Sequence, residues 1–144
     1  MAIGMTAGAT TDTTAGQRTH TFLRVSVALQ TVTVLLQAVS AGLLLSTSYG
    51  EQLHGIGARV MYGASMLYVL AAVLAWRPGG GSPRPILYAS GFLVLASAQV
   101  VLGVAHVPSV HVPLGVLVFG LSVAVLVRTP AARLVRRAAG PGAS

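Results

Sequence analysis

Residues 85–127 read PILYASGFLVLASAQVVLGVAHVPSVHVPLGVLVFGLSVAVLV, a run of 43 positions without Asp, Glu, Lys or Arg. A membrane-spanning helix needs about 20 apolar residues, and at about 1.5 Å per residue this run can cross two bilayer cores. In its middle lies HVPSVH, where Pro108 and Ser109 are typical of one helix ending and another beginning. The run therefore predicts two membrane helices, at about 85–106 and 110–128, joined by a short turn.

The first half of the chain also contains long apolar runs with few charged residues. No charged residue occurs from Val25 to Gly50, and the run from Leu53 to Trp76 is interrupted only by His54 and Arg59. These runs predict two further spans, at about 24–46 and 53–76. The segment RPGGGSPR at 77–84 separates the halves, because a helix interior does not accept its Pro and Gly residues. The fold class we expect is all-α: an integral membrane four-helix bundle.

Composition supports a membrane protein and limits its chemistry. Hydrophobic residues make up 54% of the chain, charged residues only 8%, and the mean hydropathy is +0.80. A soluble domain carries about 25% charged residues. The absence of cysteine excludes disulfides, thiolate metal sites and cysteine nucleophiles. One domain at 21–128 is predicted, between a disordered Thr/Ala/Gly-rich tail at 1–20 and a basic cytoplasmic tail at 129–144.

The arginines predict the orientation of the bundle. All nine basic residues are Arg, the net charge is +7, and a four-span topology places every Arg except Arg59 on one side of the membrane. The positive-inside rule then puts both termini and the 77–84 loop in the cytoplasm. Because these arginines flank apolar runs and are not interleaved with aromatic residues, we expect them to contact the lipid bilayer and no nucleic acid. The Arg-only, Ala/Val/Leu/Gly-rich usage indicates a GC-rich bacterial genome and hence a bacterial plasma membrane.

Three histidines come together in this topology. His54 begins the second span, His106 ends the third and His111 begins the fourth, so all three are expected at the outer membrane face. Two neutral imidazoles from different helices suit six-coordinate heme iron of the electron-transfer type. Zinc fits less well, because no Cys or Asp is near to complete a tetrahedral site, although three histidines remain an alternative. A second interpretation is that each is an ordinary interfacial residue.

Two charged residues near His54 are further candidates. Glu51 lies three residues before His54, so a carboxylate there could orient the imidazole or act as a catalytic base. Its alternative role is to complement the dipole at the helix N-terminus. Arg59 could bind a heme propionate, since arginine inside a membrane usually marks a site. However, five helical steps place it roughly 140° around the helix from His54, and it could instead snorkel to the interface.

Polar and small residues inside the spans are interpreted as packing residues. Glutamines can hydrogen-bond between helices, and glycines let helices approach closely. The glutamines are Gln30, Gln37 and Gln99, and the glycines are Gly42, Gly57, Gly63, Gly91, Gly103, Gly115 and Gly120.

The segment EQLHGIGAR at 51–59 resembles the start of the second helix of the heme A synthases, where E-x-x-H opens a long apolar run. QVVLG at 99–103, a short turn and HVPLGVL at 111–117 resemble that family's third and fourth helices. Those enzymes have eight helices in two four-helix halves, each with a histidine pair, and the likeness covers one half, residues 22–128. It implies His54 and His111 as axial ligands of a b-type or related heme, and Glu51 as a carboxylate near the substrate heme. The missing second half means that two heme sites would need a dimer, and the family's cysteine pair is absent.

The resulting hypothesis is a heme-binding membrane protein with bis-His ligation near the outer face, in which His54 and His111 bind the metal and Arg59 and His106 contact the cofactor. It would act as a cytochrome or heme-handling protein, as a homodimer or as an accessory to respiratory oxidase assembly. A half-size heme-modifying enzyme using Glu51 and a cofactor-free structural protein of the same fold are the alternatives.

The topology can be tested with reporter fusions. Because the positive-inside rule assigns the arginine-bearing segments to the cytoplasm, fusions after residue 80 and at the C-terminus should both report a cytoplasmic location. A fusion at Ser48 should report the opposite side. A signal from the outer side for the 77–84 loop would contradict the four-span topology.

Overall fold

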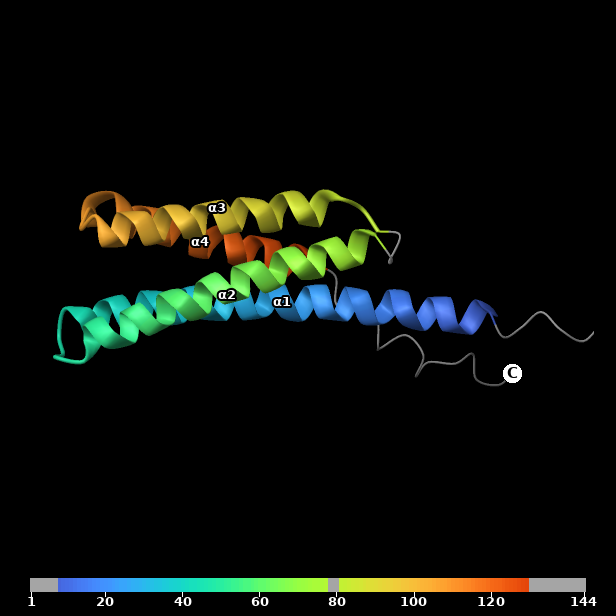
Figure 1. Cartoon of the computed structure of the whole chain (residues 1–144), viewed down its shortest axis with the longest axis horizontal. Coiled ribbons are helices and arrows are strands. Elements are labelled where there is room, and N and C mark those ends of the chain that lie inside the picture. The colour runs from blue at the N-terminus through green and yellow to red at the C-terminus, as the bar shows by residue number, and fades with distance from the viewer. Residues whose placement is uncertain (1–7, 78–80, 130–144) are drawn as a thin grey trace, which may run out of the picture.

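A computed structural model of the chain describes residues 8–77 and 81–129, and four helices make up almost all of this part (Figure 1). They are α1 (Gly8–Leu44), α2 (Gly50–Trp76), α3 (Arg84–Val104) and α4 (Pro108–Arg128). Each contains a segment long and apolar enough to cross a membrane. The predicted four-helix membrane bundle is therefore confirmed.

The helix boundaries differ most from the prediction at the N-terminus. Residues 8–20 were expected in a disordered tail but are helical, since α1 begins at Gly8. Once a helix has formed, adding a residue costs far less than nucleating a new turn, so an apolar span can extend into a weakly helical sequence. Residues 1–7 of that predicted tail, and the basic tail from residue 130 on, lie outside the described residues.

The helices form two antiparallel hairpins, α1–α2 and α3–α4, that lie side by side (Figure 1). The end of the bundle with the turns at 45–49 and 105–107 is called here the histidine end. The opposite end, with the 77–83 connection, is the arginine end. The described arginines other than Arg59 lie toward the latter: Arg18, Arg24, Arg77, Arg84 and Arg128.

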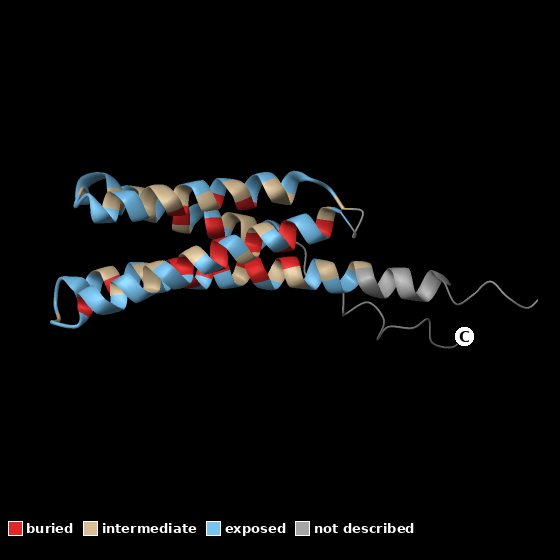
Figure 2. Ribbon diagram, in the orientation of Figure 1, coloured by how far each residue is buried: buried red, intermediate tan, exposed pale blue. Residues whose placement is uncertain are grey.

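The hydrophobic core lies in the half of the bundle nearer the arginine end, as the buried positions in Figure 2 show. In α3 the buried residues fall between Ala89 and Ala96, and in α4 they are Val118 and Ser122. Small side chains dominate the helix contacts in this core, so the helices approach closely. In a membrane no hydrophobic force drives helices together, and close packing of small residues takes its place. The small residues include Ala64, Ala71, Ala72, Ala75, Ala89 and Ala96.

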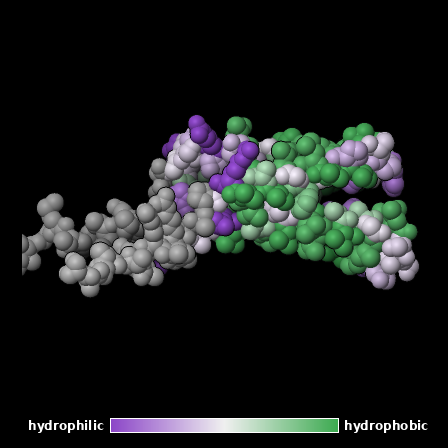
Figure 3. All heavy atoms as spheres, turned by 180° about the vertical axis from the view of Figure 1, so that it is seen from behind, coloured by the Kyte–Doolittle hydropathy of each residue, from purple (hydrophilic) through white to green (hydrophobic). Residues whose placement is uncertain are grey.

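Toward the histidine end the two hairpins separate. Residues 51–60 of α2 and 97–104 of α3 are exposed or half-buried, and the first ten residues of α4 contain no buried position. The space-filling view in Figure 3 shows a cleft between the hairpins at this end. The bundle is thus closed at one end and open at the other.

The outer surface of the spans is apolar (Figure 3). Large apolar side chains point away from the bundle, for example Leu36, Leu70, Val94, Leu117 and Val127. A lipid environment accepts such a surface, because the backbone polar groups are satisfied within each helix.

The close contact between hairpins predicts the effect of enlarging a core alanine. Ala71 is completely buried in the core, so Ala71→Leu should overpack that core and destabilise the bundle by about 1–3 kcal/mol. Thermal unfolding in detergent micelles measures the change. The same substitution at exposed Ala38 is the control and should leave the midpoint within about 1 °C. Equal effects at both positions would contradict the interface.

Candidate functional site

The cleft at the histidine end contains a pair of histidines, one from each hairpin. His54 lies in the first turns of α2 and His111 in the first turn of α4, and both side chains are half-buried. Their ring centroids are 6.2 Å apart, with the ring planes at 72°. Residues 57 positions apart in the chain thus lie close together across the two hairpins, edge toward face, as the sequence predicts for its candidate ligand pair.

The hydrogen bonds of His111 define its tautomer. Nδ1 lies 3.1 Å from the backbone carbonyl oxygen of Gln99 in α3. A carbonyl can only accept, so Nδ1 carries the proton and donates, and Nε2 keeps its lone pair. The ring also packs against Gly103, where an added Cβ would lie 3.5 Å from Cε1 of His111. Both contacts come from the backbone of α3, so neither depends on the rotamer of a partner side chain.

His54 has the same tautomer but different partners. The Ser40 hydroxyl donates to the carbonyl of Gln37 at 2.9 Å, so its oxygen accepts from Nδ1 of His54 at 3.1 Å. The Gln37 amide nitrogen lies 3.2 Å from Nε2 of His54 and 3.1 Å from its carbonyl oxygen. Because that carbonyl can only accept, the amide group facing it is the NH₂, and Nε2 accepts the other proton. Both partners of His54 are side chains of α1.

The sequence marks the glutamines only as packing residues, but the amide of Gln37 bonds to His54, and Gln99 meets His111 through its backbone carbonyl. Each amide also fits against a glycine on the neighbouring helix. A Cβ at Gly57 would collide with Oε1 of Gln37, and one at Gly115 would lie 2.8 Å from Nε2 of Gln99. Within the described part of the chain, Oε1 of both glutamines is buried without a hydrogen-bond partner. A polar residue within an apolar span is the signal by which the sequence could have identified them.

The two hairpins carry an internal repeat around this site. His54 is followed by Tyr62-Gly63 and Ser65, and His111 by Phe119-Gly120 and Ser122, so both helices read H-x7-[YF]-G-x-S. Residues 54–63 and 111–120 show the same order of half-buried, exposed and buried positions throughout. A chain built of two like hairpins places its two histidines in equivalent positions, on either side of one cleft, as in membrane proteins with parallel repeats.

The other predicted site residues do not join this pair. His106 is exposed, occupies the left-handed region with φ 54°, and its Nδ1 contacts the carbonyl of Val104 at 2.9 Å within the same turn. Glu51 is exposed in the first turn of α2, and the side chains bonded to His54 are Gln37 and Ser40 instead. Among the described residues no three His, Asp or Glu side chains form a metal-binding group. The three-histidine zinc site is therefore not formed in this arrangement.

Arg59 is exposed on α2, whereas His54 is half-buried. This placement agrees with the separation of roughly 140° between the two positions on the helix. An exposed arginine within a span can extend along the helix to reach the polar interface. Of the two interpretations of Arg59, its exposure favours snorkelling.

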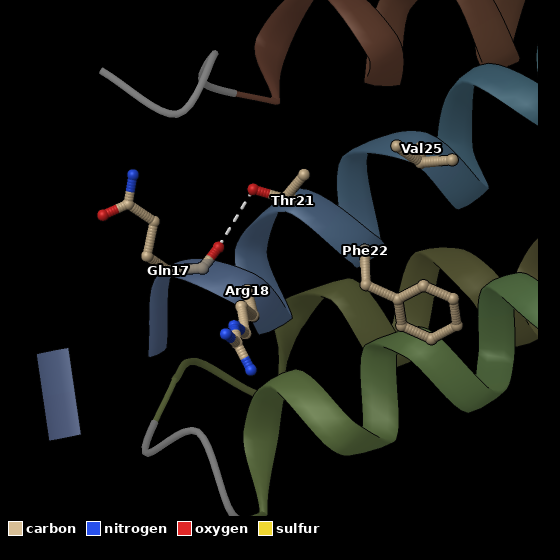
Figure 4. Close-up of a pocket in the computed structure, with 5 residues that line it drawn as sticks. All are labelled: Gln17, Arg18, Thr21, Phe22 and Val25. Carbon is tan, nitrogen blue, oxygen red and sulfur yellow. Dashed lines mark hydrogen bonds between the residues drawn. The ribbon is translucent and has the colours of Figure 1, made fainter. Parts of the chain in front are cut away.

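A second hollow, of about 590 Å³, lies toward the arginine end along one face of α1 (Figure 4). Its described lining consists of Gln17, Arg18, Thr21, Phe22 and Val25. The Thr21 hydroxyl donates to the carbonyl of Gln17 at 3.0 Å, so it is satisfied within the helix. None of the predicted site residues lies there, and its mixture of arginine and apolar groups is that of a membrane interface.

Comparison of the chain with family models, with curated proteins and with solved structures gives no match. The functional assignment therefore depends on the residues of the cleft.

Proposed function

We propose that the protein binds one heme between its two hairpins, with His54 and His111 as axial ligands. The observation that carries the proposal is the separation of the two rings. If two imidazoles bind opposite sides of one metal ion with bonds of about 2.0–2.1 Å, as zinc–imidazole bonds are, their centroids lie roughly 6 Å apart. The observed 6.2 Å is close to this value.

The donor set supports the same assignment. A histidine that binds a metal usually donates its other ring N–H to a carbonyl or hydroxyl, which fixes the tautomer. His111 does so through the Gln99 carbonyl and His54 through the Ser40 hydroxyl, so both rings carry the lone pair on Nε2. For His54 to bind a metal, the Gln37 amide must first release Nε2. The bound group would supply one-electron chemistry, and the residues described here would hold and orient it.

The open cleft is more consistent with a flat ligand than with a small ion. A single ion with two histidines lacks the further protein ligands that zinc requires, and no third candidate from the described residues joins the pair. A macrocycle brings its own four equatorial nitrogens and needs only two axial ligands. Leu53 and Val112, apolar neighbours of the two histidines in the chain, would suit its faces, and the bacterial plasma membrane is the expected location.

The second candidate is a cofactor-free structural membrane protein. One observation favours it: the Nε2 lone pair of His54 already accepts a hydrogen bond from Gln37, so this ring is satisfied without a metal. A half-size heme-modifying enzyme would need Glu51 at the reacting carbon, and the exposed position of that carboxylate outside the hydrogen-bond network lends it less support.

An absorption spectrum of detergent-purified protein, oxidised and reduced, separates the two candidates. We expect a Soret band and sharp reduced α and β bands, typical of six-coordinate bis-His heme. His54→Ala and His111→Ala should each lose the six-coordinate spectrum, because each removes one axial ligand. His106→Ala is the matched control and should keep it, since that ring is held in its own turn. Protein expressed with sufficient heme that still shows no Soret band would refute the proposal.

The exposure of Arg59 leads to a separate expectation. Arg59→Leu should retain the heme content of the wild-type protein within about 20%, because five helical steps place Arg59 roughly 140° around the helix from His54. Heme content is measured by the pyridine hemochrome method and expression by immunoblotting. A loss of more than half of the heme at unchanged expression would instead assign Arg59 to the cofactor site.

A further inference from the structure

The two halves of the site are equivalent in sequence but not in their hydrogen bonds. His111 is held by backbone groups of α3, whereas His54 is held by two side chains of α1. Positions that break the internal repeat therefore show how the two histidines differ. Ser40 in α1 corresponds to Leu102 in α3, when the helices are aligned on Gln37 and Gln99.

The second difference concerns the lone pair of Nε2. In His54 it accepts a hydrogen bond from Gln37 at 3.2 Å. No hydrogen bond to Nε2 of His111 occurs among the described residues, where the only contact of that ring's nitrogens is the one from Nδ1 to Gln99. His54 thus has an alternative partner for the electron pair that would bind a metal, and His111 has none.

Gln37 is held ready to act as this partner. Its two amide protons go to Nε2 and to the carbonyl oxygen of His54, and its Oε1 is confined against Gly57. The amide therefore stays beside the ring and can donate to Nε2 again whenever that nitrogen leaves a metal. A net hydrogen-bond free energy of ordinary size would favour release of His54 by roughly two- to twelvefold.

We propose that His111 is the permanent axial ligand and His54 the exchangeable one, so that the His54 side of the site opens to bind a small neutral molecule such as carbon monoxide. The inference rests on the proposed heme binding. In the exchange the bond between Nε2 of His54 and the metal would break, and the lone pair of Nε2 would then accept the Gln37 N–H. The incoming molecule would donate its own lone pair to the vacated position on the metal. Gln37 is a positioning residue in this step.

The test uses the full-length, heme-loaded protein in detergent, reduced with dithionite and mixed with carbon monoxide. His54→Ala should hold heme through His111 as a five-coordinate species and bind carbon monoxide at least tenfold faster than wild type, because no ligand must leave. Added imidazole should restore the six-coordinate spectrum. His111→Ala should lose most of its heme. Similar heme retention and carbon monoxide rates in the two alanine variants would overturn the inference.

A second pair of variants tests the role of Gln37 without removing a ligand. Gln37→Leu removes the competing partner, so His54 should stay bound and carbon monoxide association should slow by roughly two- to twelvefold. Gln30→Leu is the matched control, because this glutamine of the same helix accepts from Ser65 and its hydrogen bond involves no histidine, and its rate should match wild type. An unchanged or faster rate in Gln37→Leu would overturn the role of Gln37.

Heme binding and the difference between His54 and His111 are refuted by different results. Wild-type protein without a Soret band refutes heme binding, and the exchange falls with it. A bis-His spectrum together with equivalent behaviour of His54 and His111 leaves heme binding standing and refutes only their inequality.

Discussion

In the hydrocarbon core of a membrane every backbone polar group must find a partner inside the protein, and this constraint underlies the structure. It makes the chain helical and leads the hydroxyls of the spans to bond within their own helices, as Ser26 and Thr31 do to the carbonyls four residues before them. The same constraint acts on the larger polar side chains. Gln30 accepts from Ser65 and Gln37 donates to His54, so both contacts tie α1 to α2. Hydrogen bonds as well as apolar packing thus join the first hairpin.

The distribution of small and polar residues divides the bundle into a closed half and an open half. Alanines bring the hairpins together toward the arginine end, with Tyr68 packed between them and 6.2 Å from the ring of Phe92. Toward the histidine end this packing ends, and the polar network of each hairpin stays within that hairpin. At the boundary, the Tyr62 hydroxyl and Ser97 meet at 3.3 Å between α2 and α3. The closed half provides the rigidity with which the open half can hold two rings at a defined distance.

The repeated hairpin explains how a short chain can present two histidines to one another. Two copies of the same unit, packed side by side, place equivalent residues on opposite walls of the space between them. The exposure pattern shared by residues 54–63 and 111–120 shows that the repeat concerns structure as well as sequence. Within this symmetry Ser40 and Gln37 give the first hairpin its own polar environment. The proposed difference between His54 and His111 originates in these few side chains.

The sequence alone determined the four helices, their approximate limits and the end of the bundle at which His54 and His111 lie. Span length, Pro108 and the Pro/Gly segment at 77–84 determine helix limits locally, through backbone hydrogen bonding in the membrane and backbone conformation. They can therefore be recognised from the sequence without knowing the fold. The helical state of residues 8–20 was missed, because it is propagated from the neighbouring span. The positions of Gln37, Gln99 and His106 relative to the pair were decided only by the tertiary structure. Which side chain meets which ring depends on the rotation of each helix about its axis and on the distance between helices. Both follow from packing across the whole interface. At Gly57 and Gly115 the missing side chains leave the space that the glutamine amides occupy.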